Sequence, residues 1–89
     1  MKQYKYAETF IDDYRAKHPT SHFFDRDTLK FFGERISEMR ILKNTERVKD
    51  YYGEEHECYV LSSLQRKHPV RPMRAYHYFD VNTLEEITS

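Results

Sequence analysis

Residues 21–33 read Ser-His-Phe-Phe-Asp-Arg-Asp-Thr-Leu-Lys-Phe-Phe-Gly, and the predicted fold is built around this segment. Its four phenylalanines supply a large apolar area for so short a chain. Asp25 can accept hydrogen bonds from the free N–H groups that open a helix, and Asp27 adds favourable negative charge in the first turn. Gly33 can adopt the left-handed conformation that ends a helix. We therefore predict a central helix that begins near Asp25.

The end of this central helix is open between two interpretations. An apolar stripe at helical spacing continues past Gly33 through Ile36 and Met39. A glycine inside a helix costs about 1 kcal/mol relative to alanine, which favours a helix that stops at Gly33. We favour the longer helix, over about 25–38, with a bend at the glycine.

A second helix is predicted before it, over residues 1–17. Its apolar face combines aromatic side chains at four-residue spacing with aliphatic side chains beside them, namely Tyr6, Phe10, Tyr14, Ala7 and Ile11. Pro19 ends the helix because the residue before a proline is pushed out of the helical region. We expect this face to point into the core.

The C-terminal half predicts three strands, at about 45–52, 55–64 and 73–79. Gly53 and Glu54 are typical of a hairpin turn between the first two, and residues 58–61 are the most apolar part of the second. The sequence thus predicts one small α+β domain over residues 1–89, with two N-terminal helices packed on a three-stranded antiparallel β-meander.

One short pattern occurs twice in the chain. Residues 24–29 and 79–84 both read Phe-Asp-x-(Asp or Asn)-Thr-Leu. Aspartate and threonine recur in turns because their side-chain oxygens bind nearby backbone N–H groups. We interpret the echo as repeated turn chemistry.

The composition bounds the class of protein. The 89 residues carry 15 basic and 15 acidic side chains, so the chain lacks the global positive field of a dedicated nucleic-acid binder. The single cysteine, Cys58, favours a reducing compartment. No apolar run approaches the length that spans a membrane. We expect a cytoplasmic protein without a membrane partner.

Residue patterns that indicate catalysis are missing from the sequence, so we predict that the protein is not an enzyme. The two glycines, Gly33 and Gly53, lie too far apart to form a phosphate-binding loop. His56 and Cys58 could form a nucleophilic pair, but no third group that would orient them is evident.

His56 and Cys58 are also candidate metal ligands. His56 and Cys58 share one face of a strand, and His77 on the next strand could approach them. Zinc requires three or four such ligands in tetrahedral geometry, usually in paired spacings that this chain lacks. We predict no cofactor and keep a small zinc-stabilised domain as an alternative.

A basic loop is the best predicted recognition surface. It gathers cationic side chains around two prolines and is followed by two tyrosines on one strand face, so the predicted partner-binding residues are Arg66, Lys67, His68, Arg71, Arg74, Tyr76 and Tyr78. Prolines restrict the backbone and so reduce the entropy lost on binding. Arginines pair with phosphate or carboxylate, and tyrosines stack on bases or pack in protein interfaces.

Three segments carry a resemblance to a known group of proteins. They are His-Phe-Phe-Asp-x-Asp-Thr-x-Lys-Phe-Phe-Gly from His22, Arg-Lys-His-Pro-Val from Arg66, and Tyr-Phe-Asp-x-x-Thr from Tyr78. From His22 to about Leu84 the chain resembles small accessory proteins of Firmicutes phages, prophages and plasmids.

This genomic setting includes anti-CRISPR proteins, which bind host effector nucleases without catalysis. The resemblance implies a non-catalytic protein in the cytoplasm of a bacterial host, with a host protein or ribonucleoprotein complex as its partner. Direct nucleic-acid binding through the basic loop at residues 66–74 is the alternative.

Overall fold

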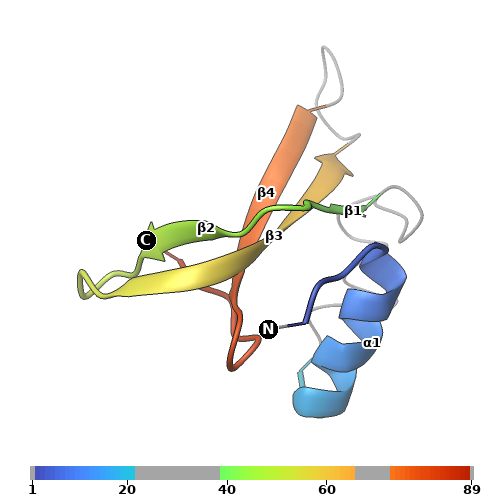
Figure 1. Cartoon of the computed structure of the whole chain (residues 1–89), viewed down its shortest axis with the longest axis horizontal. Helices are drawn as coiled ribbons and strands as arrows, with labels where there is room; N and C mark the ends of the chain where they lie inside the picture. Colours follow the sequence, from blue (N-terminus) through green and yellow to red (C-terminus); the bar gives the residue numbers. More distant parts are fainter. Residues whose placement is uncertain (1, 22–38, 66–72, 89) are drawn as a thin grey trace.

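The structure is a computed structural model that describes residues 2–21, 39–65 and 73–88. Within these ranges it is a small α+β structure with one helix and a four-stranded antiparallel sheet (Figure 1). The elements are α1 (Ala7–Lys17), β1 (Arg40–Ile41), β2 (Glu46–Lys49), β3 (Glu55–Gln65) and β4 (Met73–Asp80). None of the helical structure in these ranges has the length and apolar character needed to cross a membrane.

β3 is the central strand of the sheet. β4 pairs with it from Cys58 opposite Asp80 to Gln65 opposite Met73. β2 pairs with residues 55–58 of β3, and β1 with residues 61–62. Since both of these pairings overlap the residues bonded to β4, β1 and β2 must share the other edge of β3. β2, β3 and β4 therefore form the predicted meander. β1 pairs with β3 on the same edge as β2, farther along the strand.

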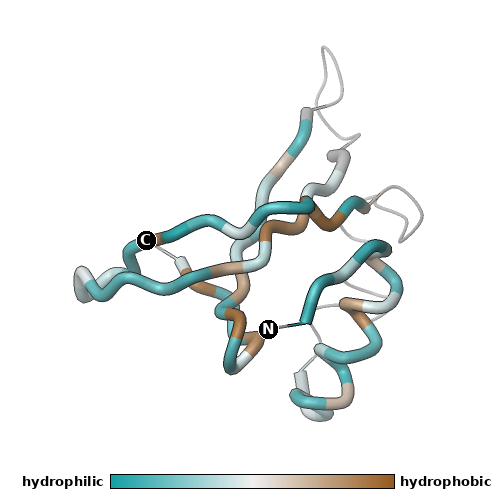
Figure 2. Tube along the Cα trace, viewed as in Figure 1, coloured by the Kyte–Doolittle hydropathy of each residue, from teal (hydrophilic) through white to brown (hydrophobic). Residues whose placement is uncertain are grey.

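Strand alternation assigns the side chains of β3 to two faces of the sheet. Tyr59 and Leu61, at odd positions, join the core beside α1, as does Phe79 of β4, which pairs with Tyr59. Cys58 and Val60, at even positions, lie on the opposite face and are also almost fully buried. Figure 2 shows the resulting apolar segment in the middle of β3, with hydrophilic chain toward the β2–β3 hairpin.

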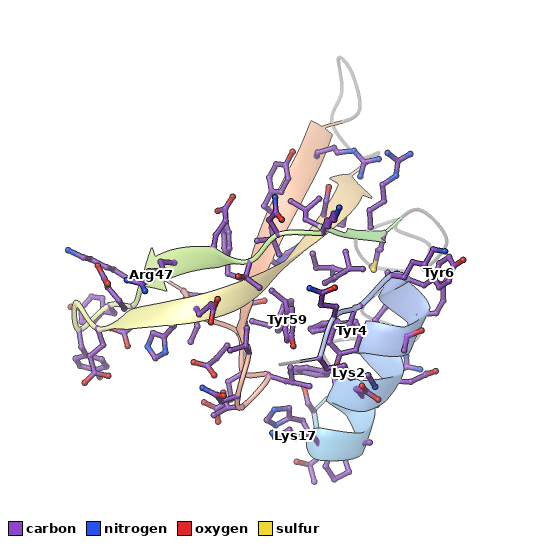
Figure 3. The ribbon with its side chains drawn as sticks, in the orientation of Figure 1. Lys2, Tyr4, Tyr6, Lys17, Arg47 and Tyr59 are labelled. Atoms are coloured by element: carbon purple, nitrogen blue, oxygen red, sulfur yellow. The ribbon has the colours of Figure 1, made fainter. Side chains whose placement is uncertain are left out.

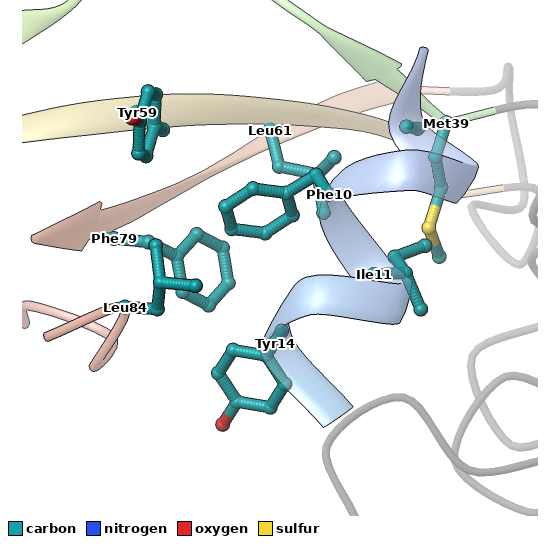
Figure 4. Close-up of a cluster of buried hydrophobic side chains, with 9 residues drawn as sticks. Phe10, Ile11, Tyr14, Met39, Tyr59, Leu61, Phe79 and Leu84 are labelled. Atoms are coloured by element: carbon teal, nitrogen blue, oxygen red, sulfur yellow. The ribbon is translucent and has the colours of Figure 1, made fainter. Parts of the chain in front are cut away.

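The core is built largely of aromatic rings between α1 and β3–β4 (Figure 4). Phe10 is fully buried, and its ring centroid lies 5.0 Å from that of Phe79 and 5.8 Å from that of Tyr59. Tilted and edge-to-face contacts at these distances add to the gain from burying the rings. The predicted core positions Phe10 and Tyr14 are confirmed.

The sequence pattern predicted that the first helix begins at residue 1, but in the structure it begins at Ala7. Tyr6 has an extended backbone and is 59% exposed, so its predicted place in the core is wrong. The segment before it is held by tertiary contacts: Tyr4 packs edge-on against Phe10 and Tyr59, and the Tyr59 hydroxyl donates to the Lys2 carbonyl. The helix ends at Lys17, which confirms the stop expected from Pro19.

The strand bounds differ from the predicted ones chiefly at β2. Instead of three strands the sheet has four, because the short β1 pairs with β3. β2 covers only residues 46–49 of the predicted 45–52, since Asp50 begins the hairpin turn. β3 and β4 agree with their predictions within one residue. The predicted central helix at 25–38, the choice of its end and the first copy of the repeated pattern lie outside the described residues.

We expect Phe10→Ala to lower the free energy of unfolding by about 3 to 5 kcal/mol, because it removes a buried ring from the centre of the aromatic cluster. Tyr6→Ala is the matched control, since this aromatic side chain is exposed and should change the stability by less than about 0.5 kcal/mol. Urea unfolding of the three proteins measures both values. Equal losses in the two variants would contradict this description of the core.

Candidate functional site

A histidine lies between two carboxylates at the hairpin end of β3. His56 on β3 bonds through Nε2 to Asp50 Oδ2 at 2.8 Å and through Nδ1 to Asp80 Oδ2 at 2.9 Å. The three side chains are only 22%, 19% and 12% exposed. Both ring nitrogens can donate at once only in the imidazolium form. The arrangement therefore favours a protonated histidine.

The second oxygen of each aspartate fixes a turn. Asp50 Oδ1 accepts from the backbone N–H of Tyr52 at 2.9 Å and of Glu54 at 3.0 Å, inside the β2–β3 hairpin. Asp80 Oδ1 accepts from the backbone N–H of Asn82 and Thr83, which confirms turn chemistry for the second copy of the repeated pattern. We call Asp50, His56 and Asp80 the histidine clamp, because it joins these two turns.

The clamp shifts the pKa values of all three members. The hydrogen bond to Asp50, followed by that to Asp80, raises the pKa of His56 above its ordinary 6.5. The hydrogen bond from His56 is the main cause that lowers the pKa of Asp50 below 3.8. Burial alone would raise the pKa of Asp80, but hydrogen bonds from His56 and two backbone N–H groups outweigh it and lower the value.

Cys58 does not have the environment of a catalytic nucleophile. Its side chain is fully buried, and burial with the nearby charges of Asp80 and Glu57 raises its pKa to about 11. The thiolate, which is the reactive form, is therefore disfavoured. His56 is beside it in sequence, but both ring nitrogens are engaged by the clamp.

The three zinc ligands weighed in the sequence do not converge. His77 lies opposite Leu61 in the β3–β4 register, on the other face of the sheet from His56 and Cys58. The His77 ring there lies 3.3 Å from Ser63 Oγ and 3.7 Å from a Glu86 carboxylate oxygen.

A different group of side chains could hold a metal ion. Asp50, Glu54 and His56 bring one ligand atom each to within 4.8 Å of one another. A metal bound to His56 Nε2 would have to replace the proton that this nitrogen shares with Asp50. The proton and a metal ion would therefore compete for the same nitrogen.

Of the predicted partner-binding residues, the structure describes the three on β4 and brings them together with one residue from β1. Arg40, Ser62 and Tyr76 are in register across three strands. Arg74 donates from Nη1 to Ser62 Oγ at 3.0 Å, and Tyr78 is the next side chain on the same face. We call Arg40, Arg74, Tyr76 and Tyr78 the arginine–tyrosine face. The remaining predicted residues, Arg66, Lys67, His68 and Arg71, lie outside the described residues.

Two further features were not expected from the sequence: the exposed tyrosine pair of the β2–β3 hairpin and the histidine clamp. Tyr51 and Tyr52 at the hairpin tip are 83% and 87% exposed, and their rings meet edge to face with centroids 5.5 Å apart. A hairpin turn was predicted at Gly53 and Glu54, and the pattern Asp50-x-x-Gly53 could have located its start, since aspartate begins such turns and Gly53, with a φ of 84°, ends this one. Adjacent tyrosines inside a turn cannot both reach the core. The clamp itself has no comparable sequence signal.

A pocket of about 440 Å³ lies beside the N-terminal segment, and Figure 3 labels four of its lining residues, Lys2, Tyr4, Lys17 and Tyr59. Its polar groups bond to one another: Asp13 accepts from Lys2 Nζ at 2.7 Å and from the Tyr4 hydroxyl at 2.8 Å. Burial and the Asp13 carboxylate raise the pKa of Tyr4, so its hydroxyl remains a donor. These contacts fasten the N-terminal segment to α1.

Comparisons of the chain with protein-family models, with curated proteins and with solved structures gave no match.

The histidine clamp predicts a specific dependence of stability on pH. The imidazolium contributes stability that is complete below pH 6.5 and is lost as the pH rises through the raised pKa of folded His56. The carboxylates contribute stability that is complete above pH 3.8 and is lost as the pH falls through their lowered pKa values. The Tm difference between wild type and His56→Gln should thus be largest between these two pH values and shrink on either side.

Asp80→Asn is the matched variant, because asparagine keeps the oxygen that caps the turn but loses the charge. We expect it to lower the Tm in the same pH window, and the double variant to lose little more than either single one. Thermal melts over the pH range test this. Additive losses, or a His56→Gln profile parallel to wild type, would show that the clamp does not act as a unit.

For metal content, we expect purified protein to hold far less than one zinc per chain and to melt at the same temperature with and without a chelator. The physical reason is that His77 lies on the opposite face from Cys58 and that carboxylates bind both His56 nitrogens. Elemental analysis and chelator melts measure this. Stoichiometric zinc whose removal lowers the Tm would establish the zinc-stabilised alternative.

Proposed function

We propose that this protein is a non-catalytic binding protein of a mobile genetic element and that it modulates a host protein. The observation that carries the proposal is the arginine–tyrosine face, where the register places exposed Arg40 and Arg74 around Tyr76, which is 52% exposed. Arginine and tyrosine are the residue types enriched in the parts of interfaces that contribute most to affinity. An acidic surface of a host protein is the complementary partner.

The anchoring of this face supports its use in binding. Arg74 is held by Ser62, which is 2% exposed, and Tyr76 and Tyr78 project from a strand bonded to the centre of the sheet. Side chains fixed in this way lose less conformational freedom when a partner binds. The resemblance of the sequence to phage and plasmid accessory proteins, among which anti-CRISPR proteins occur, favours a host effector nuclease as the partner class.

A nucleic acid is the second candidate for the same surface. Tyrosines on a sheet face can stack on bases while arginines contact the phosphates. The balance of 15 basic and 15 acidic residues argues against it, because a neutral chain gains little from releasing counterions. We therefore place the protein partner first.

Charge reversal tests the proposal. The protein should capture a host protein that mass spectrometry identifies, and the purified partner should bind wild type but lose at least about tenfold in affinity for Arg40→Glu/Arg74→Glu. Both side chains are exposed, so the Tm should fall only by the small amount that the lost Arg74–Ser62 hydrogen bond contributes. Arg47→Glu/Lys49→Glu is the matched control, because it changes the net charge equally on exposed β2 residues at the other end of the sheet.

Two results would overturn this assignment. Unchanged binding by Arg40→Glu/Arg74→Glu would show that the partner uses another surface. Tight binding of short duplexes or single strands by the isolated wild type, with an affinity that falls steeply as salt rises, would establish the nucleic-acid function instead.

A further inference from the structure

The tip of the β2–β3 hairpin carries two exposed aromatic side chains at the opposite end of the sheet from Arg74. Tyr51 and Tyr52 have the largest exposed fractions of the large hydrophobic residues that the structure describes. Figure 3 shows this hairpin projecting away from α1, with Arg47 beside it. Large exposed aromatic groups next to each other are typical of binding surfaces.

The turn presents these tyrosines on a fixed backbone. Asp50 O accepts from Gly53 N–H at 3.0 Å, and Asp50 N–H donates to Glu54 O at 2.9 Å. The Asp50 carboxylate adds bonds to two further N–H groups of the turn and to His56. A partner that contacts the tyrosines therefore meets a preformed turn, and little backbone freedom is lost on binding.

The charges around the tyrosines are mainly negative. Residues 46–57 of the hairpin carry five carboxylates, those of Glu46, Asp50, Glu54, Glu55 and Glu57, against three cations, Arg47, Lys49 and the His56 imidazolium, and the Asp80 carboxylate bonds to His56 from the end of β4. On the same hairpin, the Glu55 carboxylate is 3.8 Å from the nearest nitrogen of Arg47, and these two side chains are 54% and 81% exposed. An ion pair of this kind in water neutralises little. The hairpin tip thus combines aromatic faces with surplus negative charge.

We propose that this tip is a docking site for an arginine-bearing segment of a partner protein. A guanidinium group stacks on a tyrosine ring and also pairs with a carboxylate through two N–H donors, so one side chain satisfies both features of the tip. Lysine provides only a point charge and fits less well. Nucleic acid is disfavoured here because its phosphates would meet Glu54 and Glu55.

This surface is distinct from the arginine–tyrosine face and does not depend on it. The two surfaces use opposite ends of β3, so a partner could occupy either without touching the other. The clamp connects the tip to the turn after β4 and thereby holds it against the rest of the sheet.

The test uses the full chain and three labelled Gly/Ser peptides that carry several arginines, the same number of lysines, or the same number of glutamates. We expect the arginine peptide to bind several-fold more tightly than the lysine peptide, and the glutamate peptide not to bind. Tyr51→Ser/Tyr52→Ser should weaken the arginine peptide by about tenfold or more. Glu54→Gln should weaken it and reduce the salt dependence.

Tyr6→Ser and Tyr76→Ser are the matched controls, because each removes an exposed tyrosine elsewhere, the second on the arginine–tyrosine face. Both should bind the arginine peptide as wild type does, and all variants should keep the wild-type Tm. Equal binding of arginine and lysine peptides, or binding unaffected by Tyr51→Ser/Tyr52→Ser, would overturn the proposal. The proposal would also be overturned if wild type self-associates or binds single-stranded nucleic acid and Tyr51→Ser/Tyr52→Ser abolishes that binding.

Discussion

The pairing of β3 along both of its edges is the constraint on which the rest of the described structure depends. β4 occupies one edge and β1 with β2 the other, so a single register locates every strand. That register places Tyr59 and Leu61 in the core beside α1, and Ser62 under the arginine–tyrosine face. A slip of one residue would exchange these two faces and bury the arginines.

The histidine clamp completes this arrangement by charge and not by apolar packing. It ties the turn after β2 to the turn after β4, which are far apart in sequence but lie at the same end of β3. Packing of the aromatic core at α1 does not depend on a protonation equilibrium, whereas the clamp requires that His56 is protonated. The two parts of the molecule therefore depend on different solution conditions, and the binding tip belongs to the proton-dependent part.

Much of the sheet could be predicted from sequence, because the apolar run at residues 58–61 and the aromatic residues in 73–79 are typical of strands, and these strands pair with neighbours in the chain. β1 could not, since two residues have no periodicity and become a strand only by pairing with β3. Local patterns also predicted a first helix that is longer than the observed one. Tertiary contacts of Tyr4 and Tyr59 keep the segment before Ala7 out of the helix.

The candidate sites also contain residues that local patterns predicted and residues that only the sheet register brings together. Strand alternation correctly placed Tyr76 and Tyr78 on one face, but Arg40 joins them from a distant segment through the sheet register. The sequence indicated His56 as a candidate catalytic or metal-binding residue. Its carboxylate partners were not predicted, because the separation of Asp80 from His56 along the chain gives no recognisable motif. Pairing within elements is encoded locally, whereas contacts between turns follow from the assembled sheet.

The burial of Cys58 gives the protein an internal reporter of its own motions. This sole thiol lies on the central strand between β2 and β4, fully covered, and carries a pKa raised to about 11. A thiol-specific reagent can reach it only in molecules whose sheet has opened. The rate of labelling under native conditions therefore measures the opening free energy of the region that supports both proposed binding surfaces, without any introduced probe.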